Sequence, residues 1–418
     1  MALRVGSGLT NIHLFPLNQQ LPSPFLIHSF SPWSTLFSSL VSDQLLCLLQ
    51  PAPADHLYSR FAGAGGWLGG VLATELLTDA KTPDVNLILV DIVEPKPPKD
   101  LDPSRFVSIK ADLSQPEAVE ALFKTKLGKP TTIYCLHGIM SRGAEDNFDL
   151  GIKINVDSTR LMLEQARACG GEKPVKFIFT SSIAVFGGPL VRPPPPGTHP
   201  NPNPCPTLTS LAPRLQPHEV SPETITWPEG SYGCGKLIAE LFVNEYSRRG
   251  FVDGRIIRLP TIVVRPGVPS PATSAFVSGI IREPLHGEQA VCPIGDSFDD
   301  PALDELEVWV ASPENVIENF IIASHVDSSK MLPYTRVVNL PGFTVTVKQE
   351  LEALRDVAGQ ETLDLVTYKK DPTNARIVGS WPRAFNNDYS LSLGFVLHEG
   401  GFKSIVQTFK DGVAAGLY

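Results

Sequence analysis

Short apolar runs and longer amphipathic stretches alternate along the chain from about residue 61 onward. Runs rich in β-branched and aromatic residues are typical of strands, and they span residues 87–90, 131–136, 175–179 and 255–259. Between them, apolar residues recur at helical spacing, which predicts helices at 67–77, 117–124, 148–169 and 232–248. The alternation predicts an α/β fold, a doubly wound parallel sheet with helices on both faces and ligand sites at the carboxyl ends of the strands.

Three glycines at spacing three, Gly63, Gly66 and Gly69, lie around the start of the first expected helix. A dinucleotide needs glycine at such positions, because a side chain would block the tight turn, the approach of the backbone to a pyrophosphate and the packing of the helix on its strand. The amino terminus of the helix would then face the phosphates. Glycine clusters also mark ordinary turns, so the spacing alone leaves both interpretations open.

Asp91 directly follows the strand expected at 87–90 and lies about 20 residues after Gly69, where a dinucleotide fold places the carboxylate that binds the adenosine ribose hydroxyls. Such a carboxylate would repel a 2′-phosphate, so the sequence favours NAD over NADP. Lys96 and Lys99 lie nearby and keep NADP open. An aspartate at the end of a strand can also simply cap a turn.

A second group of polar residues indicates catalysis. Ser182 follows the strand expected at 175–179, and Tyr232 and Lys236 begin the helix expected at 232–248. Residues four apart on a helix share a face, and an ammonium beside a phenol favours the phenolate and lowers the pKa of the phenol. Tyr232 could then take a hydroxyl proton while hydride leaves the same carbon for a nicotinamide, with Ser182 holding the substrate oxygen. A single Tyr-x-x-x-Lys is more often an ordinary pair on a helix surface, but this one follows the other motifs in order.

These motifs together resemble the extended short-chain dehydrogenase/reductases, the NAD-dependent epimerase/dehydratase superfamily. The resemblance rests on Gly-x-x-Gly-x-x-Gly, Ser-Ser-x-x-Val-Phe-Gly and Tyr-x-x-x-Lys and runs from Gly63 to the C-terminus. Within the superfamily, residues 231–267, 278–285 and 376–382 are similar to the D-erythronate dehydrogenase family. The resemblance implies a Rossmann fold with a smaller C-terminal α/β substrate-binding region, and oxidation of D-erythronate to 2-dehydro-D-erythronate with NAD.

The resemblance also implies roles for single residues. Tyr232 would be the proton acceptor, Lys236 would bind the nicotinamide ribose and lower the pKa of Tyr232, and Ser182 would bind substrate. His137 is an alternative base, but it stands in a segment that lines the cofactor in the superfamily. The residues expected at the cofactor are Gly63, Gly66, Trp67, Leu68, Gly69, Asp91, Asp112, Leu113, Leu136, His137, Gly138, Asn155, Tyr232, Lys236, Leu259 and Thr261. The residues expected at the substrate are Ser141, Ser182, Tyr232, Arg265, Arg282 and Arg376.

An anionic substrate needs a cation, and three arginines in the matching C-terminal segments are candidates. Arg265, Arg282 and Arg376 each carry a guanidinium, which can bind a carboxylate through two hydrogen bonds. Each of them can equally be an ordinary surface or interface arginine. We expect that at least one of the three binds the carboxylate of the substrate.

Rival functions are separated by single residues. A sugar-nucleotide dehydratase of the superfamily carries an Asp-Glu pair directly after the catalytic Ser or Thr, whereas Ile183 and Ala184 follow Ser182, so dehydration is not expected. A nucleotide-sugar epimerase needs the same Ser, Tyr and Lys and stays open as an alternative. A regulator that senses NAD(P) without turnover is a second alternative, against which the presence of Tyr232 and Lys236 counts.

Proline marks the domain organisation, because a third of the 39 prolines fall between Pro189 and Pro228. Such a stretch is typical of an extended, poorly packed loop, and the resemblance on both sides confines the insertion to about 190–216. We expect a poorly structured segment at 1–60, an NAD-binding domain at 61–260, and a substrate-binding region at 261–418 that partly returns to the first domain. The strand expected before Gly63 carries Arg60, which is unusual for a buried central strand.

Composition narrows the partners. The formal net charge is -9 and no basic stripe is visible, so nucleic acid is not expected. The apolar stretches fall short of the roughly 18 residues that a membrane span needs, so no membrane is expected. The six cysteines are scattered without metal-ligand spacing, which favours a reducing compartment, the cytoplasm, and no bound metal. The expected partner is a small sugar acid, and a homodimer stays open.

Overall fold

The computed structural model describes residues 58–80, 83–125, 128–186, 219–267, 274–379 and 381–418, which belong to one unit spanning residues 51–418. The N-terminal segment through residue 57 and the proline-rich insertion expected at 190–216 lie outside the described residues. The side chains of Arg60 and Arg376 are likewise outside the description.

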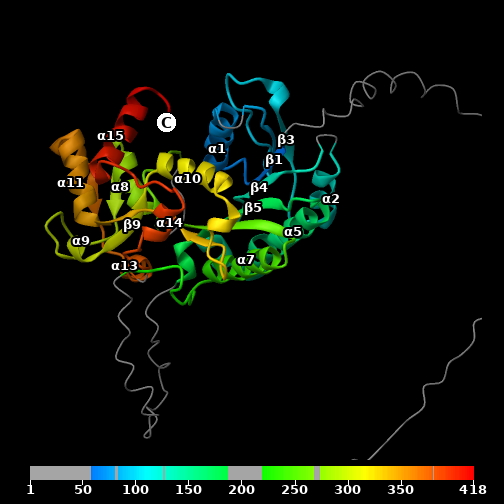
Figure 1. Cartoon of the computed structure of the whole chain (residues 1–418). Coiled ribbons are helices and arrows are strands. Elements are labelled where there is room, and N and C mark those ends of the chain that lie inside the picture. Colours follow the sequence, from blue (N-terminus) through cyan, green and yellow to red (C-terminus); the bar gives the residue numbers. More distant parts are fainter. Residues whose placement is uncertain (1–57, 81–82, 126–127, 187–218, 268–273, 380) are drawn as a thin grey trace, which may run out of the picture. The chain divides into compact units, whose positions relative to one another are not determined.

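Parallel strands form a seven-stranded main sheet in the order β10-β6-β5-β4-β1-β2-β3 (Figure 1). They are β1 (Tyr58–Ala62), β2 (Asn86–Asp91), β3 (Phe106–Lys110), β4 (Thr132–Cys135), β5 (Val175–Ser182), β6 (Val252–Leu259) and β10 (Val337–Asn339). The order reverses between β1 and β4, and a doubly wound sheet binds its ligand at such a point. The predicted fold class is thus confirmed. β1 pairs with both β2 and β4 although Arg60 interrupts its apolar pattern.

Helices cover both faces of this sheet, as Figure 1 shows. One face carries α1 (Trp67–Thr78) and α10 (Pro313–His325), and the other carries α2 (Pro116–Phe123), α5 (Ser158–Cys169) and α7 (Ser231–Arg248). Leu72 and Phe320 are among the buried residues of the first core, and Leu163 and Val243 belong to the second. The helix predicted at 148–169 is helical throughout but consists of three parts. These are α4 (Phe148–Ile152), a π-helical turn η2 (Lys153–Asp157) and α5.

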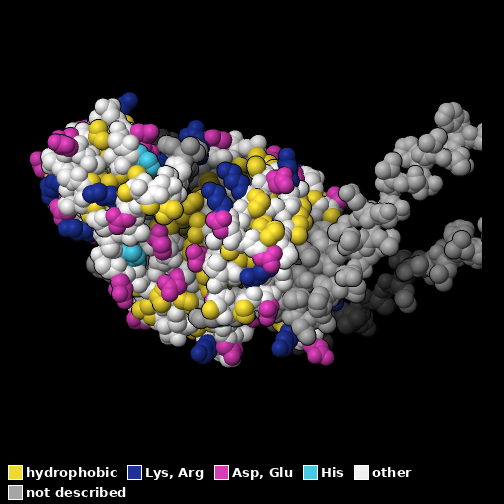
Figure 2. All heavy atoms as spheres, turned by 90° about the horizontal axis from the view of Figure 1, so that it is seen from above, with side chains coloured by type: hydrophobic (Ala, Val, Ile, Leu, Met, Phe, Trp, Pro, Cys, Tyr) yellow, Lys and Arg dark blue, Asp and Glu magenta, His cyan; other side chains and the backbone are white. Residues whose placement is uncertain are grey.

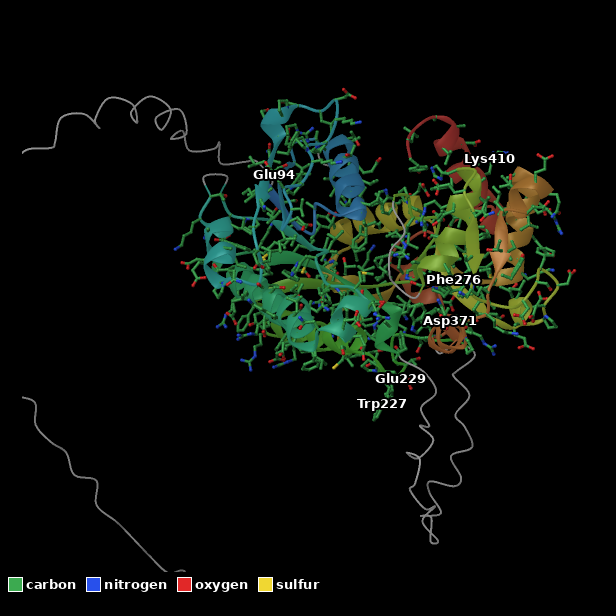
Figure 3. All side chains as sticks on the ribbon, turned by 180° about the vertical axis from the view of Figure 1, so that it is seen from behind. Glu94, Trp227, Glu229, Phe276, Asp371 and Lys410 are labelled. Carbon is green, nitrogen blue, oxygen red and sulfur yellow. The ribbon has the colours of Figure 1, made fainter. Side chains whose placement is uncertain are left out.

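Short elements complete this part of the chain. They are η1 (Pro103–Arg105), α3 (Ser141–Asp146), η3 (Ile183–Val185) and η4 (Ser328–Lys330). In the segment that leads into α7, the side chains of Trp227 and Glu229 are exposed to solvent and point away from the body of the protein (Figure 3).

The C-terminal part has a core of its own, built around a three-stranded sheet β11-β9-β7 and a two-stranded sheet β12-β8. Its strands are β7 (Thr261–Ile262), β8 (Ala290–Cys292), β9 (Glu307–Ala311), β11 (Phe343–Thr346) and β12 (Val366–Tyr368). Its helices are α8 (Ala275–Leu285), α9 (Ala302–Glu305), α11 (Val347–Ala358), α12 (Gln360–Leu363), α13 (Pro372–Gly379) and α15 (Gly401–Ala414). The short helix α14 (Asp388–Ser392) instead packs against the core of the main sheet. Between these elements the chain returns to the main sheet through α10 and β10.

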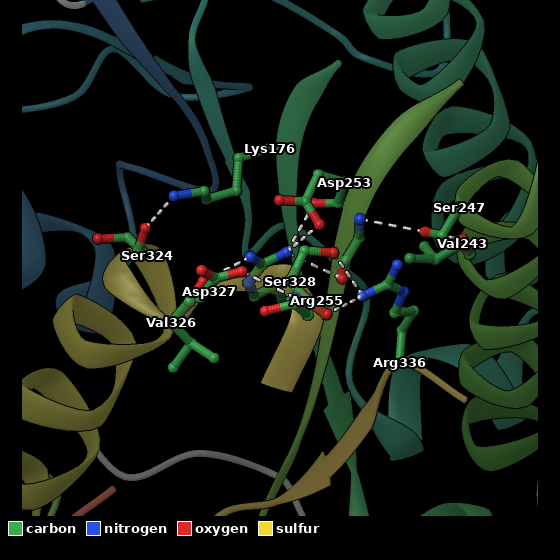
Figure 4. A network of polar contacts seen from close by, with 12 residues as sticks. Lys176, Val243, Ser247, Asp253, Arg255, Ser324, Val326, Asp327, Ser328 and Arg336 are labelled. Atoms are coloured by element: carbon green, nitrogen blue, oxygen red, sulfur yellow. Dashed lines mark hydrogen bonds and ion pairs between the residues drawn. The ribbon is translucent and has the colours of Figure 1, made fainter. Parts of the chain in front are cut away.

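A buried arginine ties the main sheet to the end of α10 (Figure 4). Arg255 of β6 is almost fully buried and forms an ion pair with Asp253, while its Nη2 donates to the carbonyl oxygen of Val326 over 2.7 Å. Nearby, Arg336 donates to the hydroxyl of Ser328 over 2.8 Å. These bonds hold β6 against the end of α10. We therefore assign Arg255 and Arg336 a structural role.

The distribution of charged side chains on the surface does not indicate a binding site on the face shown in Figure 2. Acidic and basic side chains are interspersed on the face shown in Figure 2. Within the described ranges, no helix is both long and apolar enough to cross a bilayer.

Candidate active site

The turn between β1 and α1 shows why its glycines are needed. Gly63 has a φ of +91°, and a Cβ there would lie 2.6 Å from the backbone nitrogen of His137. A Cβ on Gly69 would lie 2.3 Å from the carbonyl oxygen of Gly63, so neither position accepts a side chain. A Cβ on Gly66 would meet nothing nearer than 3.5 Å. Because Gly66 has no side chain, the space in front of the helix stays open. Such a cradle fits a phosphate that approaches the backbone.

A groove of about 340 Å³ begins at this turn and follows the carboxyl ends of β2, β3 and β4. Half of the residues expected at the cofactor line it, namely Gly63, Gly66, Asp91, Asp112, Leu113, Leu136, His137 and Gly138. Residues that the sequence did not single out complete the lining, namely Ile92, Ala111, Ser114, Ile139, Ile154 and Ser158. Ile92 directly follows Asp91, and its apolar side chain is 59% exposed. Its place next to Asp91 was a signal in the sequence from which it could have been predicted.

Two carboxylates lie in this groove. Asp91 accepts hydrogen bonds from the backbone N–H groups of Gly65 at 3.0 Å and Ile92 at 2.7 Å. Hydrogen bonds from Ser114 and Gln115 lower the pKa of Asp112. The groove therefore carries negative charge next to the glycine turn. This charge would repel an additional phosphate group bound near Asp91 and Asp112.

Trp67 and Leu68 stand at the first turn of α1 but do not line the groove with their side chains. The N-cap residue Gly66 has no side chain to cap the helix, so its first N–H groups point toward the glycine turn uncapped by a side chain. The indole of Trp67 instead lines a separate hollow beside α10, together with Ile317 and Ile321. Any contribution of Trp67 and Leu68 to a cofactor site would therefore come from their backbone.

Asn155 and His137 hold the wall of the groove in place. Asn155 is buried in the π-helical turn and exchanges two hydrogen bonds with the backbone of Ile139, at 2.9 and 3.1 Å. The Ser158 hydroxyl donates to the carbonyl of Ile154, so the nearby Nε2 of His137 is the donor in their 2.5 Å contact. Burial, and then the charge of Lys236, lower the pKa of His137 to about 3. A neutral imidazole with such a low pKa is a poor base, which weakens the alternative that His137 removes the substrate proton.

Next to the groove lies a small pocket of about 120 Å³ at the carboxyl ends of β5 and β6. It brings together six of the residues expected in the active site, which are Ser141, Ser182, Tyr232, Leu259, Thr261 and Arg265. The Ser182 hydroxyl accepts a hydrogen bond from the N–H of Ala184 at 3.1 Å. Gly233 lets α7 approach this strand end, because a Cβ there would lie 2.2 Å from the carbonyl oxygen of Ala184.

The surroundings of Tyr232 move the pKa of its phenol away from neutral pH. Burial raises the pKa of Tyr232 to about 12, while a hydrogen bond with Ser182 and the charge of Arg265 act in the opposite direction. The sequence assigned this lowering to Lys236. In the structure the charge of Arg265 also acts to lower it, from a loop that spacing on the helix could not indicate, and the role of Lys236 stays a prediction.

Lys236 is buried and points to the strand end behind the pocket. Its Nζ donates to the carbonyl oxygen of Thr180 at 2.8 Å and lies 5.8 Å from the centroid of the Tyr232 ring. Burial lowers the pKa of Lys236 to about 8, and Cys135 and Glu240 oppose that shift. A Cβ on Gly138 would lie 3.3 Å from Nζ, so the ammonium faces the wall of the cofactor groove.

The three candidate arginines differ in their surroundings. The side chain of Arg265 lines the pocket and has no carboxylate partner among the described residues. Arg282 is buried outside the pocket lining, where it pairs with Glu283 at 2.6 Å and donates to the carbonyl oxygen of Arg265 at 3.0 Å. Arg376 belongs to α13, and its side chain lies outside the described residues. Of the two candidates whose side chains are described, Arg265 is thus the one available to a ligand, and Arg282 supports its backbone.

The pocket also contains residues that the sequence prediction did not assign to it. These are Met140, Ser181, Ile183, Ala184, Pro260, Ile262, Ser274 and Trp381. Trp381 comes from the segment after α13, within the stretch that carried the family resemblance. Trp381 could have been predicted as a pocket residue because it lies in the stretch 376–382, which resembles the family. The sequence offered no such signal for Ser274.

The fold, the glycine cradle and the groove, together with a pocket that holds Ser182 and Tyr232 and has Lys236 behind it, are the features of a nucleotide-cofactor enzyme of the doubly wound α/β class. The chain belongs to the NAD dependent epimerase/dehydratase family, whose sequence profile matches residues 61–298. Members of this family use NAD(P) together with a small substrate.

Individual relatives cover most of the chain. It is 38% identical to the D-erythronate dehydrogenase of Haemophilus influenzae over 347 residues, which are 83% of this chain and 96% of that protein. It is 36% identical to the D-erythronate dehydrogenase of Cupriavidus necator over 356 residues, 84% of this chain and 96% of that protein. The nucleoside-diphosphate-sugar epimerase from Agrobacterium tumefaciens has a similar structure, with a TM-score of 0.72 at 33% identity over 86% of this chain and 95% of that one.

Proposed function

We propose that the protein oxidises D-erythronate to 2-dehydro-D-erythronate with NAD as the hydride acceptor. The observation that carries the proposal is the small pocket beside the cofactor groove in which Ser182, Tyr232 and Arg265 meet, with no carboxylate partner for Arg265 among the described residues. The similarity to two D-erythronate dehydrogenases along most of the chain supports the same substrate.

The pocket supplies a cation, a hydroxyl and a base for a 2-hydroxy acid. Arg265 would bind the substrate carboxylate, which places the neighbouring C2 hydroxyl near Ser182 and Tyr232. Ser182 would hold that hydroxyl by a hydrogen bond, and the phenolate of Tyr232 would take its proton while the C2 hydrogen leaves with its electron pair. Bound NAD supplies the acceptor for this hydride and a positive charge near the phenol. The carbon becomes a ketone, and one NADH and one proton are formed for each molecule oxidised.

NAD rather than NADP is proposed because of the charge in the groove. Asp91 and Asp112 line it, and the backbone bonds to Asp91 hold its carboxylate beside the glycine turn. A carboxylate there can accept hydrogen bonds from ribose hydroxyls and repels a 2′-phosphate. Lys236, whose ammonium faces the groove wall, would bind the nicotinamide ribose.

A nucleotide-sugar epimerase would need a larger substrate site. The pocket formed by the described residues measures about 120 Å³, whereas sites for drug-sized ligands are roughly 300–1,000 Å³. A four-carbon acid suits the smaller volume better than a sugar attached to a nucleoside diphosphate.

The experiment is an assay of NADH formation with four-carbon sugar acids, run with NAD and with NADP. We expect turnover of D-erythronate with NAD, and one NADH for each substrate consumed. An epimerase would return its hydride and accumulate no NADH. Stoichiometric NADH from another aldonate but not from D-erythronate would refute the substrate while keeping the reaction class.

A further inference from the structure

A buried carboxylate links the three elements that carry the active-site residues. Glu240 is 1% exposed and lies on α7 one turn after Lys236. Its Oε1 accepts a hydrogen bond from the Ser181 hydroxyl of β5 at 2.5 Å. The guanidinium of Arg258 on β6, which is 4% exposed, binds both carboxylate oxygens at 2.9 and 2.7 Å.

Each partner of this carboxylate is adjacent to a residue of the pocket. Ser181 precedes Ser182, and Arg258 precedes Leu259, which lines the pocket. Arg258 also lies over the ring of Phe186, with its Cζ 4.7 Å from the centroid. In the parallel pairing of β5 with β6, Ser181 stands opposite Arg258, so the bonds close a ring between the two strand ends and α7.

The same carboxylate lies near Lys236. Lys236 stands one turn before Glu240 on α7 and donates to the carbonyl oxygen of Thr180, and Ser181, the next residue of β5, donates to Glu240. The titratable groups that face the Lys236 ammonium are Cys135 of β4, His137 after it, and Tyr232 and Glu240 of α7. Cys135 is buried, and burial raises its pKa to about 12, so the thiol is uncharged near neutral pH. Among the described groups around the ammonium, Glu240 therefore supplies the negative charge.

We propose that Glu240, held by Arg258 and Ser181, is a positioning residue that fixes α7 against the ends of β5 and β6 and keeps Lys236 charged. It acts through Lys236 and touches neither substrate nor cofactor. The inference rests on the proposed function insofar as Lys236 serves the oxidation. It adds to it the means by which a buried lysine, whose pKa burial lowers to about 8, remains an ammonium near neutral pH.

The test compares Glu240→Gln with the wild type by two readouts. Loss of the carboxylate should lower the pKa of Lys236 by roughly one unit, because a neighbouring opposite charge shifts a pKa by about 1–3 units. NMR of protein labelled with ¹³C at the lysine Cε, with the signal assigned by Lys236→Arg, measures this pKa without any substrate. The alkaline limb of kcat/KM should move to lower pH by the same amount, with a loss of kcat/KM that approaches about tenfold well above pH 8.

A second variant guards against a folding defect, since removing one partner of a buried ion pair leaves an unpaired charge. Glu240→Met combined with Arg258→Met removes both charges and keeps apolar volume, so it should fold. Because it also removes a cation that disfavours the Lys236 ammonium, the pKa of Lys236 should fall less than in Glu240→Gln. The control is Glu245→Gln on the same helix, which breaks the surface pairs with Arg248 and Arg249 and should change neither readout.

The outcomes separate the two proposals. An unchanged Lys236 pKa in folded Glu240→Gln, or a Lys236 pKa that rises in the double variant, would overturn the role of Glu240, whatever the substrate is. A wild type that oxidises no aldonate would overturn the proposed function, and a lowered Lys236 pKa would still support the positioning role.

Discussion

Replacing Arg265 by glutamine tests the substrate site most sharply, because this guanidinium has two separable effects. It is proposed to bind the substrate carboxylate, and its charge lowers the pKa of Tyr232. Glutamine keeps a hydrogen-bonding side chain and removes the charge. The change should therefore impair both the binding of an acid and the ionisation of the base.

The magnitude follows from the kind of bond that is lost. A hydrogen bond to a charged group contributes about 1.5–3 kcal/mol, and each 1.4 kcal/mol is a factor of ten. We expect kcat/KM for D-erythronate to fall roughly 10- to 150-fold. Loss of the cation also raises the pKa of Tyr232 further, and a base must be deprotonated to act, so the acidic limb of kcat should move to higher pH.

The assay compares D-erythronate with its uncharged amide by the rate of NADH formation. The wild type should prefer the acid, and Arg265→Gln should treat the two nearly alike. Arg383→Gln is the control, since Arg383 is an exposed arginine paired with Glu307 at 2.9 Å and outside the pocket lining. Equal losses on acid and amide would show that Arg265 does not bind the carboxylate, and an unchanged pH profile would refute its effect on Tyr232.

Further predictions concern the base, the cofactor and the core. Tyr232→Phe should lose about 10²- to 10⁴-fold in kcat while NADH still binds, as measured by protein fluorescence; full turnover would exclude Tyr232 as the base. Asp91→Asn should lower the preference for NAD over NADP at least tenfold in kcat/KM, and an unchanged ratio would remove Asp91 from cofactor selection. Glu350 is fully buried, and neither carboxylate oxygen has a hydrogen-bond partner in the described part of the chain, so burial raises its pKa well above the usual value. The folded state therefore holds this proton more tightly than the unfolded state, so stability is fully present below the unfolded pKa and falls as pH rises above it, by up to about 1.4 kcal/mol per pH unit. Glu350→Gln should flatten this decline in urea unfolding at pH 6 and 8, and an equal slope in both proteins would contradict it.

The fold was predictable because its signals are local. The strands at 87–90, 131–136, 175–179 and 255–259 are buried on both faces and read as short apolar runs, and the helices between them begin and end near the predicted residues. The π-helical turn at Lys153–Asp157 was not predictable, since one extra residue in a turn leaves the apolar spacing almost unchanged. The turn nevertheless matters, because it places Asn155 against the backbone of Ile139.

The sequence motifs predicted which residues belong to the candidate site. They did not predict which of these residues contact one another. Spacing alone could not tell Arg265 from Arg282, because the difference lies in tertiary packing, in which Arg265 lines the pocket and Arg282 donates to the carbonyl oxygen of Arg265. The same limit applies to Lys236, which is bonded to the carbonyl of Thr180 while Arg265 is the cation that lowers the pKa of Tyr232. Which charges meet depends on how the C-terminal part packs on the sheet, and a pattern along one helix does not contain that information.

The most direct test of the proposed reaction follows the hydrogen at C2 of the substrate. D-erythronate carrying deuterium at C2 is incubated with the protein and NAD, and the reduced cofactor is examined by NMR and mass spectrometry. We predict that deuterium appears at C4 of the nicotinamide ring in a one-to-one ratio with 2-dehydro-D-erythronate. Deuterium that stays in the sugar acid, or is lost to water without forming labelled NADH, would contradict the assignment of this chain as a D-erythronate-oxidising enzyme.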